Sequence, residues 1–297
     1  MNNLGKTLLL LFVAIVSSEL CATTKNHKAT LQYKNAGVNF YTTKEIYSKA
    51  WQLSLDLALE KYQQLISTPH PIDVYLLEDT FQAILLRNSA SDKPQLVLSL
   101  DILESKKKGD STSYSVINHE LCHLWFIETL KSKGLNQTKD PTGAPTYGHS
   151  NAEDWIDESV AIHCETGPNK SSKLTQHFTP IPLSQFLDME NPAFALVKEH
   201  IVSQLKANQD KQIVIKKEFN DESLYVFYQQ AYWFREFLLA TLGELTYQEI
   251  AETLVKQGNV NQYLLSQLGH RDWLETDRAF KNFIVNRQST LTANVSL

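Results

Sequence analysis

Two histidines four residues apart, His119 and His123, are the residues of this chain best suited to chemistry. On an α-helix, positions four apart lie on one face, so both imidazoles can bind the same metal ion. Glu120 lies one position round the helix from His119, where its carboxylate can reach a metal-bound water rather than the metal. The pattern His-Glu-x-x-His therefore predicts a zinc ion that activates water, with Glu120 as the general base.

The segment around these histidines is largely apolar, which predicts a buried helix over residues 113–130. Val116 and Ile117 precede the motif, and Leu124 and Trp125 follow it. Two imidazoles and a carboxylate facing a core without a metal would be costly polar groups without partners. The alternative is an ordinary structural helix whose histidines find partners within the core.

A catalytic zinc usually has three protein ligands and one position open for water. We expect Glu158 to be the third ligand, because it lies in the middle of a second predicted helix over 150–165. In that helix Ala161 is small enough to allow close packing on the first one. A histidine soon after the motif is excluded, since residues 124–128 read Leu-Trp-Phe-Ile-Glu. Asp157 is then either a support for the site or a surface charge. The other candidate ligands are His149, Asp154, Asp157 and His163.

These two helices resemble those of the gluzincin clan of metallopeptidases, in which a His-Glu-x-x-His helix is followed by a helix bearing (Asp or Asn)-Glu-x-x-Ala. The likeness is to peptidase MA-like domains and, more distantly, to the aminopeptidase/leukotriene-hydrolase family. It covers about residues 40 to 270 and implies a zincin-like fold with one Zn²⁺ held by His119, His123 and Glu158. It also implies a metallopeptidase in which Glu120 is the general base.

Those families carry a later helix with the pattern Tyr-x-x-(small)-aromatic, whose tyrosine assists catalysis. Tyr228 begins the matching stretch of this chain, Tyr-Gln-Gln-Ala-Tyr. The resemblance therefore implies that Tyr228, together with the metal, stabilises the oxyanion formed in the reaction. Tyr225 and Tyr232 compete for this role, and any of the three could instead be a core aromatic.

One departure from the family concerns the strand before the zinc helix. The aminopeptidase group has Gly-Ala-Met-Glu-Asn there, and its glutamate binds the free amine of the substrate. Residues 96–101 of this chain read Leu-Val-Leu-Ser-Leu-Asp, so we expect an endopeptidase rather than an aminopeptidase. Residues 96–100 could instead form an edge strand that pairs with an extended peptide substrate.

The order of the predicted elements indicates an α+β fold in which the sheet comes first. Residues 31–41 are β-like with a break at 35–37, and apolar positions at helical spacing predict a helix over 43–66 that is capped by Thr43. The other predicted strands are 72–77, 83–86 and 96–100.

The second half of the chain is predicted to be helical. A loop over 131–149 precedes the second metal-site helix, for which Ser150 and Glu153 form a predicted capping box. We expect a twisted mixed sheet with a packed helix over about 30–133, a helical half over about 150–290, and the active-site cleft between them. The further predicted helices are 183–187, 192–207, 222–242, 247–256, 260–268 and 272–286.

The N-terminus has the layout of a secretory signal peptide. Lys6 supplies a positive charge, residues 8–16 are an apolar run too short to span a bilayer comfortably, and Ala22 offers a small residue at a cleavage site. We therefore predict a signal peptide over 1–22, export to the periplasm or the medium, and a single zincin-like catalytic domain over 23–297. The alternative is an N-terminal core helix or an uncleaved anchor.

Two cysteines, Cys122 and Cys164, remain after such cleavage. An even pair in an exported protein permits a disulfide. The alternative is two small buried hydrophobic side chains. Both interpretations stay open at this point.

The overall composition is that of a folded globular protein, with 42% hydrophobic and 21% charged residues among 297. A net charge of −5 and a pI near 6.0 provide no basic footprint, so nucleic acid is not expected as a partner. No second apolar stretch reaches membrane length, so we expect a soluble mature protein whose partner is a peptide or protein substrate. The oligomeric state is not predicted.

Two other functions stay open. One is a catalytically silent peptidase-like protein that binds a component of the cell envelope, and the other is a zinc hydrolase of a non-peptide amide. A serine hydrolase is disfavoured, because residues 148–152 lack the second glycine of a nucleophile elbow.

Overall fold

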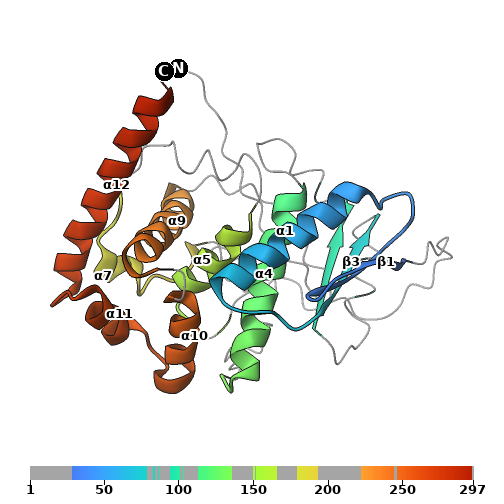
Figure 1. Cartoon of the computed structure of the whole chain (residues 1–297), viewed down its shortest axis with the longest axis horizontal. Helices are drawn as coiled ribbons and strands as arrows, with labels where there is room; N and C mark the ends of the chain where they lie inside the picture. Colours follow the sequence, from blue (N-terminus) through green and yellow to red (C-terminus); the bar gives the residue numbers. More distant parts are fainter. Residues whose placement is uncertain are drawn as a thin grey trace, which may run out of the picture.

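The computed structural model describes residues 29–78, 83, 86, 94–100, 103, 113–135, 150, 152–165, 179–192, 222–243 and 246–295. Within this part of the chain, one four-stranded mixed sheet and eight helices form an α+β protein (Figure 1). The α+β prediction is therefore confirmed. The predicted signal peptide, His149 and nearly all of the predicted helix 192–207 lie outside the described residues.

The sheet is built from β1 (Thr30–Lys34), β2 (Val38–Thr42), β3 (Ile72–Leu77) and β4 (Gln95–Ser99). Its strand order is β1-β2-β3-β4, with β1 antiparallel to β2 and the other two pairings parallel. The predicted break in the first β segment is confirmed as the turn of a hairpin. There Asn35 Oδ1 accepts hydrogen bonds from the backbone N–H groups of Gly37 and Val38, each at 2.9 Å. Among the described strands β4 lies at the edge, as predicted.

The helix α1 (Lys49–Leu65) packs against one face of this sheet. Side chains at alternate positions of β2 and β3 share a hydrophobic core with it, and the rings of Phe40 and Trp51 lie 6.1 Å apart between centroids. Alternation along a strand places every second side chain on the same face, which explains why these positions are buried.

Two predictions in this half are wrong. The helix predicted from Thr43 begins at Lys49, because the extended backbone of Ser48 (φ −144°) separates it from a turn that the Tyr47 N–H closes onto the Thr43 carbonyl at 3.1 Å. Ala83, predicted to lie in a strand, is helical, and so is Leu86. An apolar run of only four residues does not distinguish a strand from a buried helical turn.

The helix α4 (Ser113–Ser132) carries the two histidines and confirms the predicted buried helix. Trp125, on this helix, donates a hydrogen bond from Nε1 to the Gly37 carbonyl at 3.0 Å. A Cβ atom at position 37 would lie 2.8 Å from the Trp125 ring, closer than real Cβ contacts. Glycine in the hairpin turn therefore lets the histidine helix approach the sheet.

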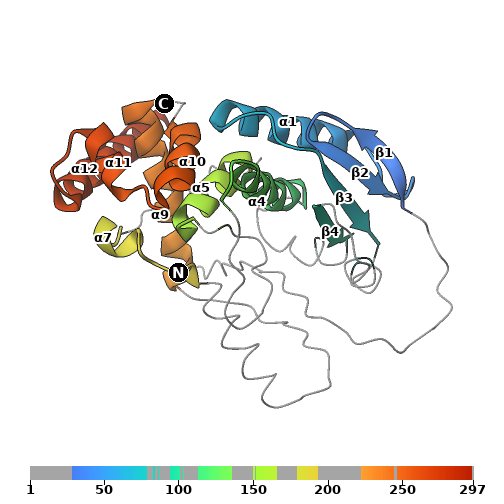
Figure 2. The ribbon, with the colours of Figure 1, turned by 90° about the horizontal axis from the view of Figure 1, so that it is seen from below.

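The remaining elements of the described part of the chain are helices, which Figures 1 and 2 show on the far side of α4 from the sheet. The helix α5 (Asp154–Cys164) lies between α4 and α9, and buried residues of both halves of the chain form one continuous core. The other helices are α7 (Leu183–Phe186), α9 (Glu222–Leu242), α10 (Thr246–Gln257), α11 (Asn261–Leu268) and α12 (Trp273–Val295).

The helices of this half begin within one residue of the predicted starts, except for α5, predicted from Ser150. The last helix extends nine residues beyond its predicted end at 286, to Val295. No glycine or proline follows Trp273, so nothing in the local sequence stops that helix earlier.

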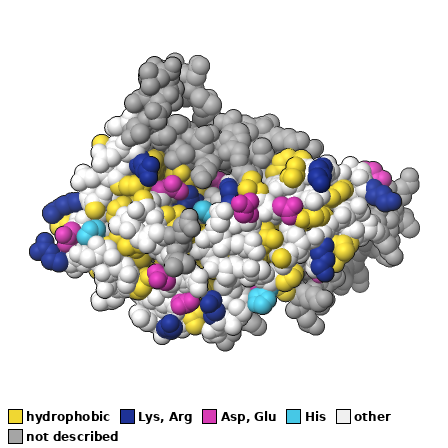
Figure 3. Space-filling view, viewed as in Figure 1, with side chains coloured by type: hydrophobic (Ala, Val, Ile, Leu, Met, Phe, Trp, Pro, Cys, Tyr) yellow, Lys and Arg dark blue, Asp and Glu magenta, His cyan; other side chains and the backbone are white. Residues whose placement is uncertain are grey.

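The surface seen in Figure 3 mixes charges of both signs. The described Lys and Arg side chains on that face are interspersed with Asp and Glu side chains rather than gathered in one area. Of the helices in the described part of the chain, none combines the length and apolar character needed to cross a bilayer.

Candidate metal centre

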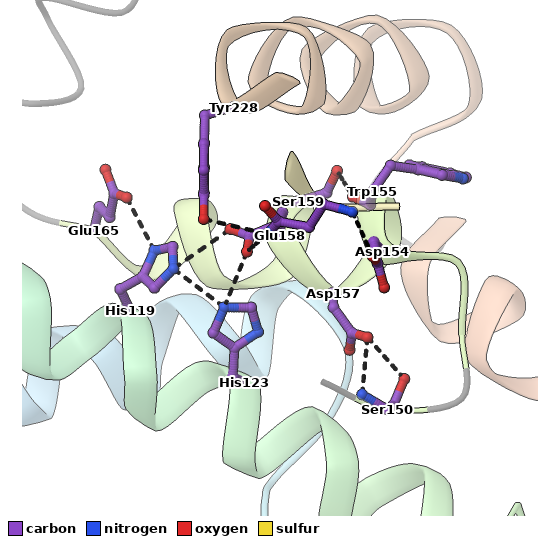
Figure 4. A network of polar contacts seen from close by, with 11 residues as sticks. His119, His123, Ser150, Asp154, Trp155, Asp157, Glu158, Ser159, Glu165 and Tyr228 are labelled. Carbon is purple, nitrogen blue, oxygen red and sulfur yellow. Dashed lines mark hydrogen bonds and ion pairs between the residues drawn. The ribbon is translucent and has the colours of Figure 1, made fainter. Parts of the chain in front are cut away.

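The imidazoles of His119 and His123 face each other on α4, as their spacing predicts (Figure 4). Their Nε2 atoms are 3.1 Å apart, and the ring planes are inclined by 78°. His123 is almost fully buried, and His119 is partly buried. Without a metal, one ring has to donate its Nε2–H to the Nε2 atom of the other ring. Only one of these two facing nitrogen atoms therefore carries a hydrogen.

Glu158 reaches this pair from α5. Its Oε2 lies 3.4 Å from His119 Nε2, and its Oε1 lies 3.7 Å from His123 Nε2. Ligand atoms bound at about 2.1 Å to a tetrahedral ion are about 3.4 Å from one another. The separations between the two imidazole nitrogens and from His119 to Oε2 are close to this value, and one ligand atom from each of the three residues lies within 4.8 Å of the others, so the group could hold a metal. Among the described residues, His119, His123 and Glu158 form one group of this kind.

A disulfide between Cys122 and Cys164 joins the two helices that supply these side chains. Of the two interpretations that the sequence leaves open, the structure contains the cross-link. Both cysteines are buried, and their Cα atoms are 6.4 Å apart. On α5 the small Ala161 is also fully buried, in agreement with close packing of the two helices.

Glu165, which directly follows α5, forms a hydrogen bond with the outer nitrogen of a predicted ligand. Its Oε1 lies 3.0 Å from His119 Nδ1. A carboxylate accepting from Nδ1–H directs Nε2 toward the metal position and makes that nitrogen a better ligand. The sequence analysis missed this residue.

The electrostatics of His119 follow from these two carboxylates. Burial alone would lower the pKa of His119, but hydrogen bonds to Glu158 and Glu165 and their negative charges raise the pKa to about 10 in the metal-free protein. The site therefore attracts positive charge strongly, and a metal ion would replace that proton.

Tyr228 points into the same site from α9 (Figure 4). Burial, followed by the negative charge of Glu158, raises the pKa of the Tyr228 hydroxyl well above its ordinary value. The hydroxyl therefore stays protonated and can serve as a hydrogen-bond donor. Of the competing tyrosines, Tyr232 packs its ring under the Arg235 guanidinium at 4.7 Å. Burial raises the pKa of Tyr225, and a hydrogen bond with Gln229 acts against that rise.

Asn191 is a second residue that the sequence analysis missed. Its Nδ2 lies 2.8 Å from Glu158 Oε1 and 3.2 Å from the Tyr228 hydroxyl. The side chain is fully buried between α5 and α9. Asn191 therefore links the predicted ligand to the predicted catalytic tyrosine.

Glu120 is partly buried on α4 and does not belong to the group that could hold the ion. Its negative charge is one of the smaller causes that raise the pKa of Tyr228. The role of Glu120 as the general base stays a prediction.

The other acidic residues of α5 accept hydrogen bonds from neighbouring segments. Asp157 is buried, and its Oδ2 accepts hydrogen bonds from the Ser150 N–H at 2.9 Å and the Ser150 hydroxyl at 3.0 Å. The predicted capping box is wrong, because the chain is extended at Glu153 (ψ 134°) and α5 begins only at Asp154. Ser150 therefore donates its hydrogen bonds to the Asp157 side chain within the helix. Asp154 Oδ2 accepts a hydrogen bond from the backbone N–H of Asn191, with 2.6 Å between oxygen and nitrogen. Like Asp157, it is outside the candidate ligand group, and so is His163.

No protein-family model, no curated protein and no solved structure matches the chain. Its residues define an α+β protein with a His-His-Glu group, held between two disulfide-linked helices, that could bind a metal ion. Its function is therefore inferred from its own residues.

Proposed function

We propose that the protein is a zinc-dependent metallopeptidase with a zincin-like fold, similar to the gluzincins, that cleaves within peptide chains. One observation carries this proposal: Glu158 from α5 converges on the imidazoles of α4 at distances that suit a tetrahedral ion. Tyr228 points into the same site, and the negative charge of Glu120 acts on its hydroxyl. Zinc suits two imidazoles and one carboxylate with a position left for water.

The metal ligands, Glu120 and Tyr228 would each have a separate role in hydrolysis. His119, His123 and Glu158 would hold the zinc, which when bound would lower the pKa of a water molecule toward neutrality. Glu120 would accept a proton from the attacking water and pass it to the leaving amine. Tyr228, kept protonated by its buried setting, donates a hydrogen bond to the oxyanion of the substrate.

Replacing Glu120 with Gln tests the proposal directly. Zinc stoichiometry should stay at one per chain, whereas turnover of a quenched peptide library should fall by about 10²- to 10⁴-fold, because only the general base is lost. Glu128→Gln is a matched control on the same helix, since Glu128 forms an exposed ion pair with Lys131 at 2.7 Å. A fully active Glu120→Gln protein would refute the assignment.

The choice of substrate separates this function from its alternatives. Cleavage of peptides blocked at both ends supports an endopeptidase, and cleavage restricted to free N-termini contradicts it. Zinc binding without turnover of any peptide favours the silent binding protein. Turnover of small non-peptide amides alone favours the other hydrolase.

Export is part of the proposal and is supported by the disulfide, because disulfides persist in oxidising compartments. N-terminal sequencing of the mature protein from a fractionated culture should give a chain that starts at Thr23 in the periplasm or the medium. An intact N-terminus on protein from the cytoplasm would contradict export.

A further inference from the structure

The buried amide of Asn191 has a defined orientation between two residues of the site. Glu158 Oε1 can only accept a hydrogen bond, so the group that faces it at 2.8 Å is the NH₂ of Asn191 rather than its oxygen. The same nitrogen lies 3.2 Å from the Tyr228 hydroxyl. One amide therefore donates to both a predicted metal ligand and a predicted catalytic group.

The segment that carries Asn191, residues 179–192, is attached to α5. The Asn191 backbone N–H donates to Asp154 Oδ2 at 2.6 Å, and its side chain donates to Glu158. Asp154 and Glu158 are four residues apart on α5, so they lie on one face of that helix. Backbone and side chain of Asn191 are thus held by two carboxylates one turn apart.

The same segment is also attached to two other helices. The side-chain amide of Gln230, on α9, pairs with the backbone N–H and carbonyl of Ile181, each at 2.9 Å. Asp277, on α12, accepts a hydrogen bond from the Leu183 N–H at 3.1 Å. Attachment at three helices leaves the Asn191 side chain little freedom before a substrate arrives, which is how supporting residues lower the cost of organising a site.

We propose that Asn191 is a positioning residue for the reaction. By holding Oε1 of Glu158, it keeps Oε2 directed toward His119 Nε2, where a metal ion would be bound. By donating to the Tyr228 oxygen, it turns the hydroxyl hydrogen away from itself and into the site. This inference rests on the proposed metallopeptidase function.

The first test measures zinc affinity by competition with a chromogenic chelator. Asn191→Leu, which has a similar size and no donor, should bind Zn²⁺ about 10- to 100-fold more weakly, as do proteins that lose a partner of a metal ligand. Asn282→Leu is the control, since Asn282 is exposed on α12.

The second test measures kcat and KM on a peptide at saturating zinc. Asn191→Leu should lower kcat by about tenfold or more with little change in KM, because Tyr228 loses its orientation. In the double variant with Tyr228→Phe, the two losses in kcat should not multiply, since one residue acts through the other. Multiplying losses would refute the effect on Tyr228.

A third variant covers the case in which Asn191→Leu does not fold. Asn191→Ser keeps one donor but has a shorter reach, so its zinc affinity and kcat should lie below those of the wild type. Zinc affinity and kcat within twofold of wild type in the folded variants would overturn the inference. If the wild type binds zinc but cleaves no peptide, the proposed function fails, while the affinity measurement still tests the contact between Asn191 and Glu158.

Discussion

Cys122 and Cys164 connect the two metal-site helices at positions directly beside the site. Cys122 precedes His123, and Cys164 precedes Glu165, so one covalent bond fixes both the buried histidine and the residue that orients His119. The cross-link spans 42 residues, a loop long enough for a large effect on the unfolded chain.

The double variant Cys122→Ala/Cys164→Ala should therefore be less stable by about 2–4 kcal/mol in urea unfolding of the metal-free protein. Its zinc affinity should also fall, because the two helices are no longer held at a fixed separation. Wild-type protein refolded in reductant should behave like the variant, and reductant should leave the variant unchanged. Equal zinc affinity of the oxidised and reduced wild type would contradict a role for the disulfide at the site.

Replacing Glu158 should abolish stable metal binding. Elemental analysis of purified protein should give one zinc per chain for the wild type and close to none for Glu158→Ala, because two imidazoles alone make an incomplete site. Glu128→Gln is the control, and it should retain zinc, since Glu128 forms an ion pair with Lys131 at 2.7 Å. Full zinc occupancy in Glu158→Ala would show that another residue is the third ligand.

The parts of the site that the sequence predicts are those that depend on helix geometry alone. His119 and His123 are four residues apart, and that spacing brings their Nε2 atoms to one side of any α-helix. Glu158 is predicted because it lies in the middle of the second helix, where the small Ala161 allows close packing on the first helix. Apolar runs bounded by turn residues predict the strands. The prediction is wrong at Ala83, where the apolar run is short.

Glu165 and Asn191 could not be predicted because their roles depend on packing between elements. Glu165 lies just past the end of α5, and its carboxylate reaches His119 Nδ1 on the neighbouring helix. A disulfide between Cys122 and Cys164 would have indicated Glu165, because it brings position 165 close to α4. Asn191 comes 33 residues after Glu158, and no spacing rule connects them.

Glu165 should affect zinc through His119. Glu165→Ala removes the acceptor at His119 Nδ1 and should weaken zinc binding by about 10- to 100-fold. Glu165→Gln keeps an acceptor without the charge, so its zinc affinity should lie between those of Glu165→Ala and the wild type. Chelator competition measures both effects. Glu128→Gln on α4 should leave the affinity unchanged, and an unaltered affinity in Glu165→Ala would show that His119 is oriented without it.

The pH dependence of the metal-free protein provides a separate check on the same carboxylates. The folded-state pKa of His119 is about 10, raised by Glu158 and Glu165 against the effect of burial, and the ordinary value is 6.5. A raised pKa means that the charged imidazole stabilises the fold fully below pH 6.5 and that this contribution is lost as the pH rises toward 10. Urea midpoints in chelator should therefore show a difference between wild type and His119→Gln that shrinks over this range. Since zinc has to displace the proton, binding should release it, and calorimetry in buffers of different ionisation enthalpy should detect that release at neutral pH. A difference in midpoints that does not change with pH would show that the carboxylates do not hold a proton on His119.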